Sequence, residues 1–398
     1  MANFKTIEDL GNLQGKTVML RADLNVPMNS ACEVTDLTRI ERTAPTIKLL
    51  LKKGAKVVVA THFGRPKKQS DKEFSVRPIA APLERILGNK VVFLEDCIGK
   101  EVKNAIKNMK QEEVILLENL RFHPEEEGND LNFAKELVDG IDFYISDAFS
   151  TSHRAHASTY QAATLRPHAA GLLMQQELEA LEGALTSPKH PVAAIVGGSK
   201  VSTKLDILTN LIEKVDLLVI GGGMANTFLY AKGEDIGNSL CEKDMAETAI
   251  KIMEKAKAKG CEIFLPSDVV IADSLEDGKH AKTISADEVP TDKMILDIGE
   301  ASTKTLIEKL DKCQTLVWNG PVGAFEYPPF EKATFEIAKK VGKLSKAGKL
   351  LSVAGGGDTV AALEKAGVSE DISYVSTAGG AFLEWLEGKK LPGVEALK

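Results

Sequence analysis

Short apolar runs rich in β-branched residues recur along the chain, with amphipathic stretches between them. The runs predict strands at residues 17–20, 56–60, 90–94, 114–117 and 142–145, and again at 192–196, 216–220, 262–265, 315–318, 350–354 and 373–375. Helical spacing marks residues 38–53, 129–140, 244–259, 327–347 and 359–366. Because strands alternate with helices, we expect an α/β protein whose parallel sheets carry helices on both faces.

A single seam divides the chain. Residues 175–183 predict a helix, and residues 185–191 (LTSPKHP) form a polar break before the next strand. A chain of 398 residues is too long for one compact core. We therefore expect two similar-sized Rossmann-like domains joined by a hinge helix, one at residues 1–172 and the other at 173–389.

Composition and charge narrow the class of protein. The formal net charge of -7 gives a nucleic-acid-binding role no overall electrostatic support. The five cysteines are scattered without a C-x-x-C, which is typical of buried, reduced thiols in a cytosolic protein and makes metal binding by them unexpected. No apolar signal core and no 18-residue apolar run occur, so neither export nor a membrane span is expected.

In the first half, basic and polar side chains follow the predicted strands. Guanidinium groups bind phosphate and carboxylate through paired hydrogen bonds, and imidazole adds a donor. Any one of these arginines taken alone would be a surface residue, but their recurrence at successive strand ends predicts an anion pocket. The His153 and His156 pair lacks the cysteine or carboxylate that would complete a zinc site. The candidate residues are Asp23, Asn25, Arg39, His62, Arg65, Arg121 and Arg154.

In the second half, the strand ends carry glycine instead. The loops GGSKVSTK (197–204), GGGMANT (221–227), GGGDT (355–359) and STAGG (376–380) each precede a predicted helix. Glycine lets backbone N–H groups approach phosphate oxygens, and the helix N-terminus adds a favourable dipole. One such loop is often tight packing alone, whereas four predict a polyphosphate ligand. Neither G-x-x-x-x-G-K-[ST] nor G-x-G-x-x-G occurs in them, which argues against a P-loop NTPase and a Rossmann dehydrogenase.

Charged residues in these loops suggest how the ligand is held. Lys200 and Lys204 are four apart near a helix start, so we expect them to share one face and point at phosphates. Asp358 is placed to hold Mg²⁺ beside the phosphates, or to cap the following helix, or both. The run at residues 317–326 (VWNGPVGAFE) offers apolar surface for a base and Glu326 for ribose hydroxyls, although a structural turn is the simpler interpretation.

The ordered strings RADLNVP, THFGRP, LENLRF, DAFSTSHRAHAS, GGSKVSTK, WNGPVGAFE, GGGDT and STAGGAF resemble phosphoglycerate kinase from about residue 5 to the end. The resemblance implies reversible transfer of the acyl phosphate of 1,3-bisphosphoglycerate to Mg-ADP in glycolysis, giving 3-phosphoglycerate and ATP. It assigns to the phosphoglycerate Asp23, Asn25, Arg39, His62, Phe63, Gly64, Arg65, Arg121 and Arg154. It assigns to the nucleotide Lys204, Glu326, Gly356, Gly357, Asp358 and Thr359, with Asp358 on the Mg²⁺ side.

The resemblance also implies catalytic roles for Arg39, Lys200, Lys204, Gly379 and Gly380 near the transferred group. It further implies a cytoplasmic monomer with domain closure, in which residues 390–398 return to the first domain. We interpret Arg39 and Lys204 as flanking the phosphoryl group. Three segments depart from the family pattern: Ser150-Thr151-Ser152, Ala378-Gly379-Gly380 and residues 299–303.

Two other classes of protein remain open from the residues. A nicotinamide-dependent oxidoreductase would share parallel sheets and glycine loops but should show G-x-G-x-x-G. A two-domain anion-binding protein without catalysis would share a basic pocket, yet it should carry an export signal and has no need of Lys200 or Asp358.

Overall fold

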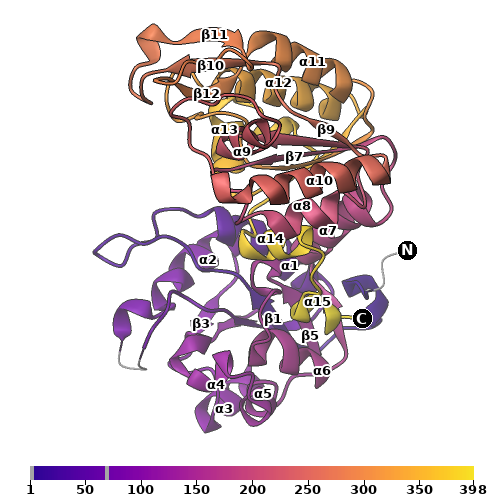
Figure 1. Ribbon diagram of the computed structural model, residues 1–398. Helices are drawn as coiled ribbons and strands as arrows, with labels where there is room; N and C mark the ends of the chain where they lie inside the picture. The colour runs from indigo at the N-terminus through magenta and orange to yellow at the C-terminus, as the bar shows by residue number, and fades with distance from the viewer. Residues whose placement is uncertain (1–3, 68–70) are drawn as a thin grey trace. The chain divides into compact units, whose positions relative to one another are not determined.

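The computed structural model describes residues 4–67 and 71–398, which form two compact units (Figure 1). One unit comprises Met1–Glu179 with Lys390–Lys398, and the other comprises Ala180–Lys389. The boundary falls inside helix α7 (Leu172–Leu181), several residues beyond the junction expected at 172/173. No helix among the described residues is long and apolar enough to cross a membrane.

The first unit is built on a six-stranded sheet in which every pairing is parallel. Strand β6 was not predicted, because its three residues, His168–Ala170, are too short to show a period. In sheet order the strands are β3 (Val91–Phe93), β4 (Val114–Leu116), β2 (Lys56–Ala60), β1 (Thr17–Ala22), β5 (Phe143–Asp147) and β6.

Most helices of the first unit bury apolar side chains. In α1 (Thr38–Lys52) the buried residues Ile40, Ala44, Ile47 and Leu50 recur at helical spacing and join the core around β1 and β2. The last helix, α15 (Pro392–Glu395), belongs to this unit, and the backbone N–H of Gly393 donates to Ser152 O at 2.9 Å. The others are α2 (Ala80–Leu87), α3 (Lys100–Asn108), α4 (Pro124–Glu127), α5 (Leu131–Leu137) and α6 (Ala162–Thr164).

The second unit has a parallel six-stranded sheet of its own. Its order is β15 (Tyr374–Ser376), β14 (Leu351–Gly355), β13 (Thr315–Asn319), β7 (Val192–Gly197), β8 (Leu217–Gly221) and β9 (Glu262–Phe264). All residues of the central strands β13, β7 and β8 are buried, as expected when helices cover both faces.

Helices lie on both faces of this sheet. Figure 1 shows α8 (Leu205–Leu211) and α10 (Ala246–Lys259) on one side, and α11 (Glu300–Leu310) and α12 (Lys332–Lys346) on the other. The remaining helices are α9 (Gly223–Ala231), α13 (Gly357–Lys365) and α14 (Gly380–Leu386). The predicted fold class is therefore confirmed for both units.

A small antiparallel sheet in the second unit was missed. It consists of β11 (Lys282–Ser285), β10 (Asp268–Ala272) and β12 (Met294–Ile298), in that order. β10 and β12 each contain a short apolar run, but β11 is almost wholly exposed and lacks the pattern of a strand in a sheet. Asp268 accepts from the backbone N–H groups of Ala301 and Ser302 and so stabilises the start of α11 in one of the segments that departs from the family pattern.

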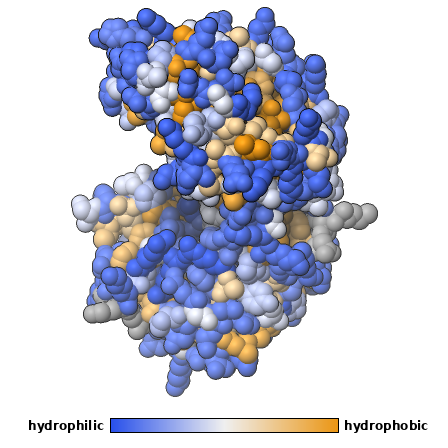
Figure 2. All heavy atoms as spheres, viewed as in Figure 1, coloured by the Kyte–Doolittle hydropathy of each residue, from blue (hydrophilic) through white to orange (hydrophobic). Residues whose placement is uncertain are grey.

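On the face shown in Figure 2, hydrophilic residues predominate on both units and apolar residues form smaller groups. Few large apolar side chains are exposed. One of them, Leu240, has half of its surface exposed and also lines the cavity described below.

Candidate functional site

Arg39 lies in the first turn of α1, where it pairs with the carboxylate of Asp23, which follows β1. The hydroxyl of Ser150, after β5, donates to the same Asp23 oxygen. Asp23 and Ser150 follow strand ends that are neighbours in the sheet, because β1 pairs with β5, and Arg39 reaches them from the start of α1. The structure thus brings together two predicted residues, Asp23 and Arg39, and adds Ser150, which departs from the usual family residue.

The loop after β2 is held by neighbouring loops. The backbone N–H of Gly64 donates to Asn25 Oδ1 at 3.0 Å, and Arg121 Nη1 donates to Gly64 O at 2.7 Å. Asn119, which is fully buried, accepts from Phe63 N at 3.1 Å and donates to Phe63 O at 2.7 Å. Asn25, Phe63, Gly64 and Arg121 therefore form one connected group, and Asn119 is the positioning residue that the sequence analysis missed.

Arg21 has a different role from the one its sequence position suggests. Strand β1 continues through Ala22, so Arg21 is inside the strand and only 1% exposed. Its guanidinium donates to Ser158 Oγ at 2.8 Å, and the buried carboxylate of Glu126 accepts from the same hydroxyl at 2.5 Å. The Arg21 guanidinium is therefore hydrogen-bonded to residues inside the unit, and it contributes positive charge to the pocket.

Excess positive charge gathers around two buried histidines. Burial, with the charges of Arg21, Arg121 and Arg39, lowers the pKa of His62 well below its usual value. Burial, with the charges of Arg121, Arg21 and Arg154, lowers the pKa of His156 to about 4. Both imidazoles are therefore neutral at physiological pH and offer hydrogen bonds without adding charge. A multiply charged anion would relieve the repulsion among the arginines.

The remaining predicted residues of the first unit differ in how they lie relative to these arginines and histidines. Arg154 is half-buried, and its Nε donates to His153 Nε2 at 3.1 Å. Arg65 is exposed. His168 lies at the start of β6, and its Nδ1 lies 2.8 Å from Ala163 O.

In the second unit, three helices begin directly after a glycine in the left-handed region. Gly222, Gly356 and Gly379 are the N-caps of α9, α13 and α14, with φ of 66°, 97° and 53°. At Gly222 a Cβ would also lie 2.8 Å from Gly198 O, so only glycine fits. Backbone N–H groups at helix starts can bind anions, and in α9 those of Gly222 and Met224 already donate to Val322 O and Gly198 O.

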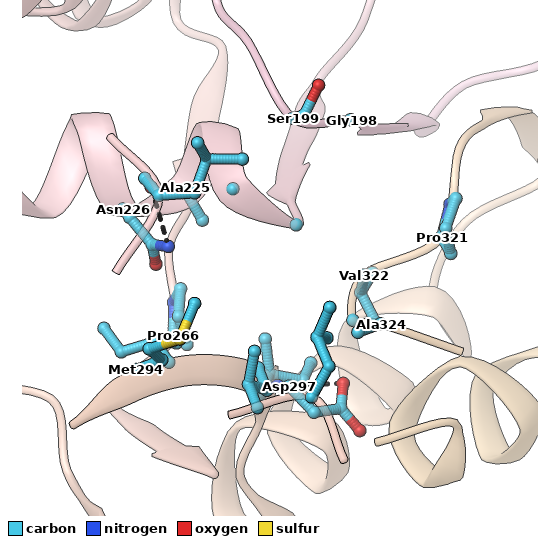
Figure 3. Close-up of a pocket in the computed structure, with 18 of the residues that line it drawn as sticks. Gly198, Ser199, Ala225, Asn226, Pro266, Met294, Asp297, Pro321, Val322 and Ala324 are labelled. Atoms are coloured by element: carbon cyan, nitrogen blue, oxygen red, sulfur yellow. Dashed lines mark hydrogen bonds between the residues drawn. The ribbon is translucent and has the colours of Figure 1, made fainter. Parts of the chain in front are cut away.

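A cavity of about 330 Å³ opens beside these loops (Figure 3). Gly198 and Ser199 lie opposite Met294 and Asp297, and Asn226 faces Val322 and Ala324. Of the predicted residues, Asp358 and Glu326 line it. Its apolar walls include Leu240, Pro266 and Leu296, which come partly from the antiparallel sheet that the sequence analysis missed.

Lys204 is connected to the other glycine loops through Asn319. Lys204 Nζ donates to Asn319 Oδ1 at 2.6 Å, and Asn319 Nδ2 donates to Gly355 O at 2.8 Å. Burial lowers the pKa of Lys204, and the charge of Asp358 opposes this shift. Thr359 accepts from Gly320 N at 2.7 Å and donates to Gly355 O at 2.9 Å. Asn319 joins the loops after β7, β13 and β14, a role visible only from the strand order.

Several local expectations need correction. Lys200 and Lys204 do not share a helical face, because α8 begins at Leu205 and both lie in the preceding loop, where Lys200 is exposed. Asp358 is in the first turn of α13, and the N-cap is Gly356. Trp318, within the run proposed to hold a base, is 2% exposed and donates to Gly320 O.

The loop before α14 has a backbone conformation at position 378 that alanine can adopt. Ala378 is not among the residues with positive φ, so alanine is tolerated where the family usually has glycine. Its N–H donates to Ser376 Oγ at 3.2 Å. Gly379 and Gly380 begin α14, and neither lines the cavity near Asp358.

Together these features define a two-unit α/β protein with a group of arginine and histidine side chains in one unit and a cavity flanked by glycine loops in the other. A family model described as phosphoglycerate kinase matches residues 7–389. The phosphoglycerate kinase of Chelativorans sp. (strain BNC1) is 57% identical over the full length of both chains. That of Methylorubrum extorquens (strain PA1) is 56% identical over all of this chain and 99% of its own.

Solved structures agree with these relatives. The phosphoglycerate kinase of Coxiella burnetii superposes with a TM-score of 0.91 at 41% identity, covering 99% of this chain and 98% of its own. That of Pyrococcus horikoshii OT3 gives 0.78 at 33% identity with the same coverage. The chain belongs to the phosphoglycerate kinase family.

Proposed function

We propose that this protein catalyses the reversible transfer of the acyl phosphate of 1,3-bisphosphoglycerate to Mg-ADP, giving 3-phosphoglycerate and ATP. Family membership over the whole chain carries this proposal. The basic site of the first unit suits the phosphoglycerate, and the cavity of the second unit suits the nucleotide. On the same basis we propose a monomer that acts in glycolysis in the cytoplasm.

The proposed roles follow the chemistry of the two sites. Asp23, Asn25, Arg39, His62, Arg121 and Arg154 would bind the phosphoglycerate, with Arg65 turning inward once the anion is present. Transfer from an acyl phosphate needs little proton transfer, because attacking and leaving oxygens are both anionic; the main requirement is to neutralise charge. We assign this task to Arg39, Lys204 and the N–H groups near Gly379 and Gly380, with Lys200 approaching from its exposed loop.

Mg²⁺ fits the second site if phosphate supplies most of its ligands. Asp358 lines the cavity, and among the described residues no three His, Cys or carboxylate groups converge there. Mg²⁺ commonly takes one or two carboxylates and completes its shell with water and phosphate oxygens. Asp358 would hold the ion, and the ion would screen the charge of the nucleotide phosphates.

A coupled assay with ADP and the acyl phosphate tests the activity directly. ATP formation that requires Mg²⁺ is the expected result. If ATP does not form while both ligands still bind, the protein is a two-domain anion-binding protein without catalysis, and the proposal is wrong.

A further inference from the structure

Three potential zinc ligands converge in the first unit, apart from the arginine site. The carboxylate of Asp96, the thiol of Cys97 and the imidazole of His123 have ligand atoms that all lie within 4.8 Å of one another. Among the described residues this is the one place where at least three such groups meet. We propose that Asp96, Cys97 and His123 bind a zinc ion.

The fold explains why these residues meet. Strands β3 and β4 are parallel neighbours, so the segments that leave their carboxyl ends lie at one edge of the sheet. Asp96 and Cys97 lie between β3 and α3, and His123 follows the 3-10 turn Leu120–Phe122 after β4. In the sequence the cysteine and the histidine are 26 positions apart, which hides the cluster from spacing motifs.

Local contacts hold the three groups in place. Asp96 Oδ1 accepts from the backbone N–H of Cys97 at 2.7 Å and lies 2.7 Å from His123 Nε2. The His123 ring packs against Phe133 with ring centroids 5.2 Å apart. Ligand atoms in a tetrahedral zinc site lie roughly 3.3–3.8 Å apart. Side-chain rotations that move the three ligand atoms by about 1 Å therefore bring them into range.

The donor set and its exposure suit zinc with one open position. Thiolate and imidazole select zinc over Mg²⁺, which prefers oxygen ligands. Cys97 is buried, whereas the side chains of Asp96 and His123 are 40% and 18% exposed, so water can reach a fourth position. On binding, the thiol proton leaves to solvent, a Zn–S bond forms, and the metal replaces the proton between His123 and Asp96.

The chain offers matched control residues. Cys313 is another buried thiol, and His280 makes a similar contact with Asp277 at 2.6 Å with no third ligand nearby in the described structure. The probe is Co²⁺ added to the metal-free full-length protein in excess Mg²⁺, because cobalt bound to a thiolate gives a charge-transfer absorption that oxygen ligands do not.

We expect a cobalt–thiolate absorption that saturates at one equivalent of cobalt per chain. Zinc should abolish this absorption by displacing the cobalt. Cys97→Ala should eliminate it, and His123→Gln and Asp96→Asn should each weaken cobalt affinity at least about ten-fold. Cys313→Ala and His280→Gln should leave it unchanged. If Cys97→Ala does not fold, the His123 and Asp96 variants decide the matter. Absence of the absorption, its persistence in Cys97→Ala, or unchanged affinity in both other ligand variants overturns the proposal.

Discussion

Asp147 is the last residue of β5, and its carboxylate links this strand to the start of helix α7. It is fully buried, and its Oδ1 accepts from the N–H groups of Leu173 at 2.9 Å and Met174 at 3.0 Å in the first turn of α7. Burial raises its pKa from 3.8 to about 6, although a hydrogen bond from Thr46 and those from α7 oppose the shift. The charged form of Asp147 therefore lowers the stability of the folded protein.

The size of that cost follows from the shift. A difference of about two pKa units at 1.36 kcal/mol each corresponds to roughly 3 kcal/mol at neutral pH. Because the folded-state pKa is raised, the stabilising contribution of protonation is complete below about pH 3.8 and is lost as pH rises through about 6. Asp147→Asn retains an acceptor oxygen for α7 without the charge. We therefore expect this variant to be more stable than the native protein at neutral pH, by up to about 3 kcal/mol.

Thermal unfolding of both proteins between neutral pH and about pH 4 measures the difference. The gap in melting temperature should narrow as pH falls and close near the lower limit. Asp147→Ala is the control, because it also removes the charge but leaves the two N–H groups unpaired, so it should be less stable than the Asn variant by about 1–3 kcal/mol at every pH. An Asn variant that is less stable at neutral pH, or a gap that does not change with pH, would refute the reasoning.

Three further predictions concern the proposed reaction. Arg39→Ala should lower turnover at saturating substrates by roughly 10²-fold, because it removes a charge from the transferred group, whereas the exposed Arg85→Ala should not; near-normal turnover would contradict the assignment. Asn319→Ala should lower turnover by at least about ten-fold, because Lys204 loses its hydrogen-bond partner at 2.6 Å and Gly355 loses the hydrogen bond from Asn319. An unchanged kcat in steady-state kinetics would exclude this role. Solution scattering should give a smaller radius of gyration with both substrates bound than with either alone, since direct transfer requires the two ligands to meet; an unchanged radius would count against closure.

Much of the fold is predictable from local patterns. The buried central strands of both sheets appear as apolar runs because both of their faces are covered, as in Val192–Gly197. In the small antiparallel sheet β11 is mostly exposed and lacks this signal, and β6 has only three residues. Those elements are stabilised by their neighbours, which a local window does not contain.

The candidate site shows the same division. Asp23 and Asp358 are recognisable because residue type near a strand end indicates chemistry. The buried state of Arg21 was not predictable, since it depends on β1 continuing through Ala22 and on Glu126 arriving from helix α4. Asn119, in a loop, and Asn319, the last residue of β13, were missed for a related reason: the role of such an asparagine depends on which segments lie next to it.

By itself, then, the sequence determined the alternation of strands and helices, the arginine-bearing loops of one half and the glycine-bearing loops of the other. Hydrophobic period and backbone preference are local properties, so they can be read along the chain. Only the tertiary structure decided which loops touch. The order β14-β13-β7 sets Asn319 between Lys204 and Gly355, and the pairing of β3 with β4 brings Cys97 to His123. Such meetings depend on strand adjacency, which is a property of the folded sheet and not of sequence order.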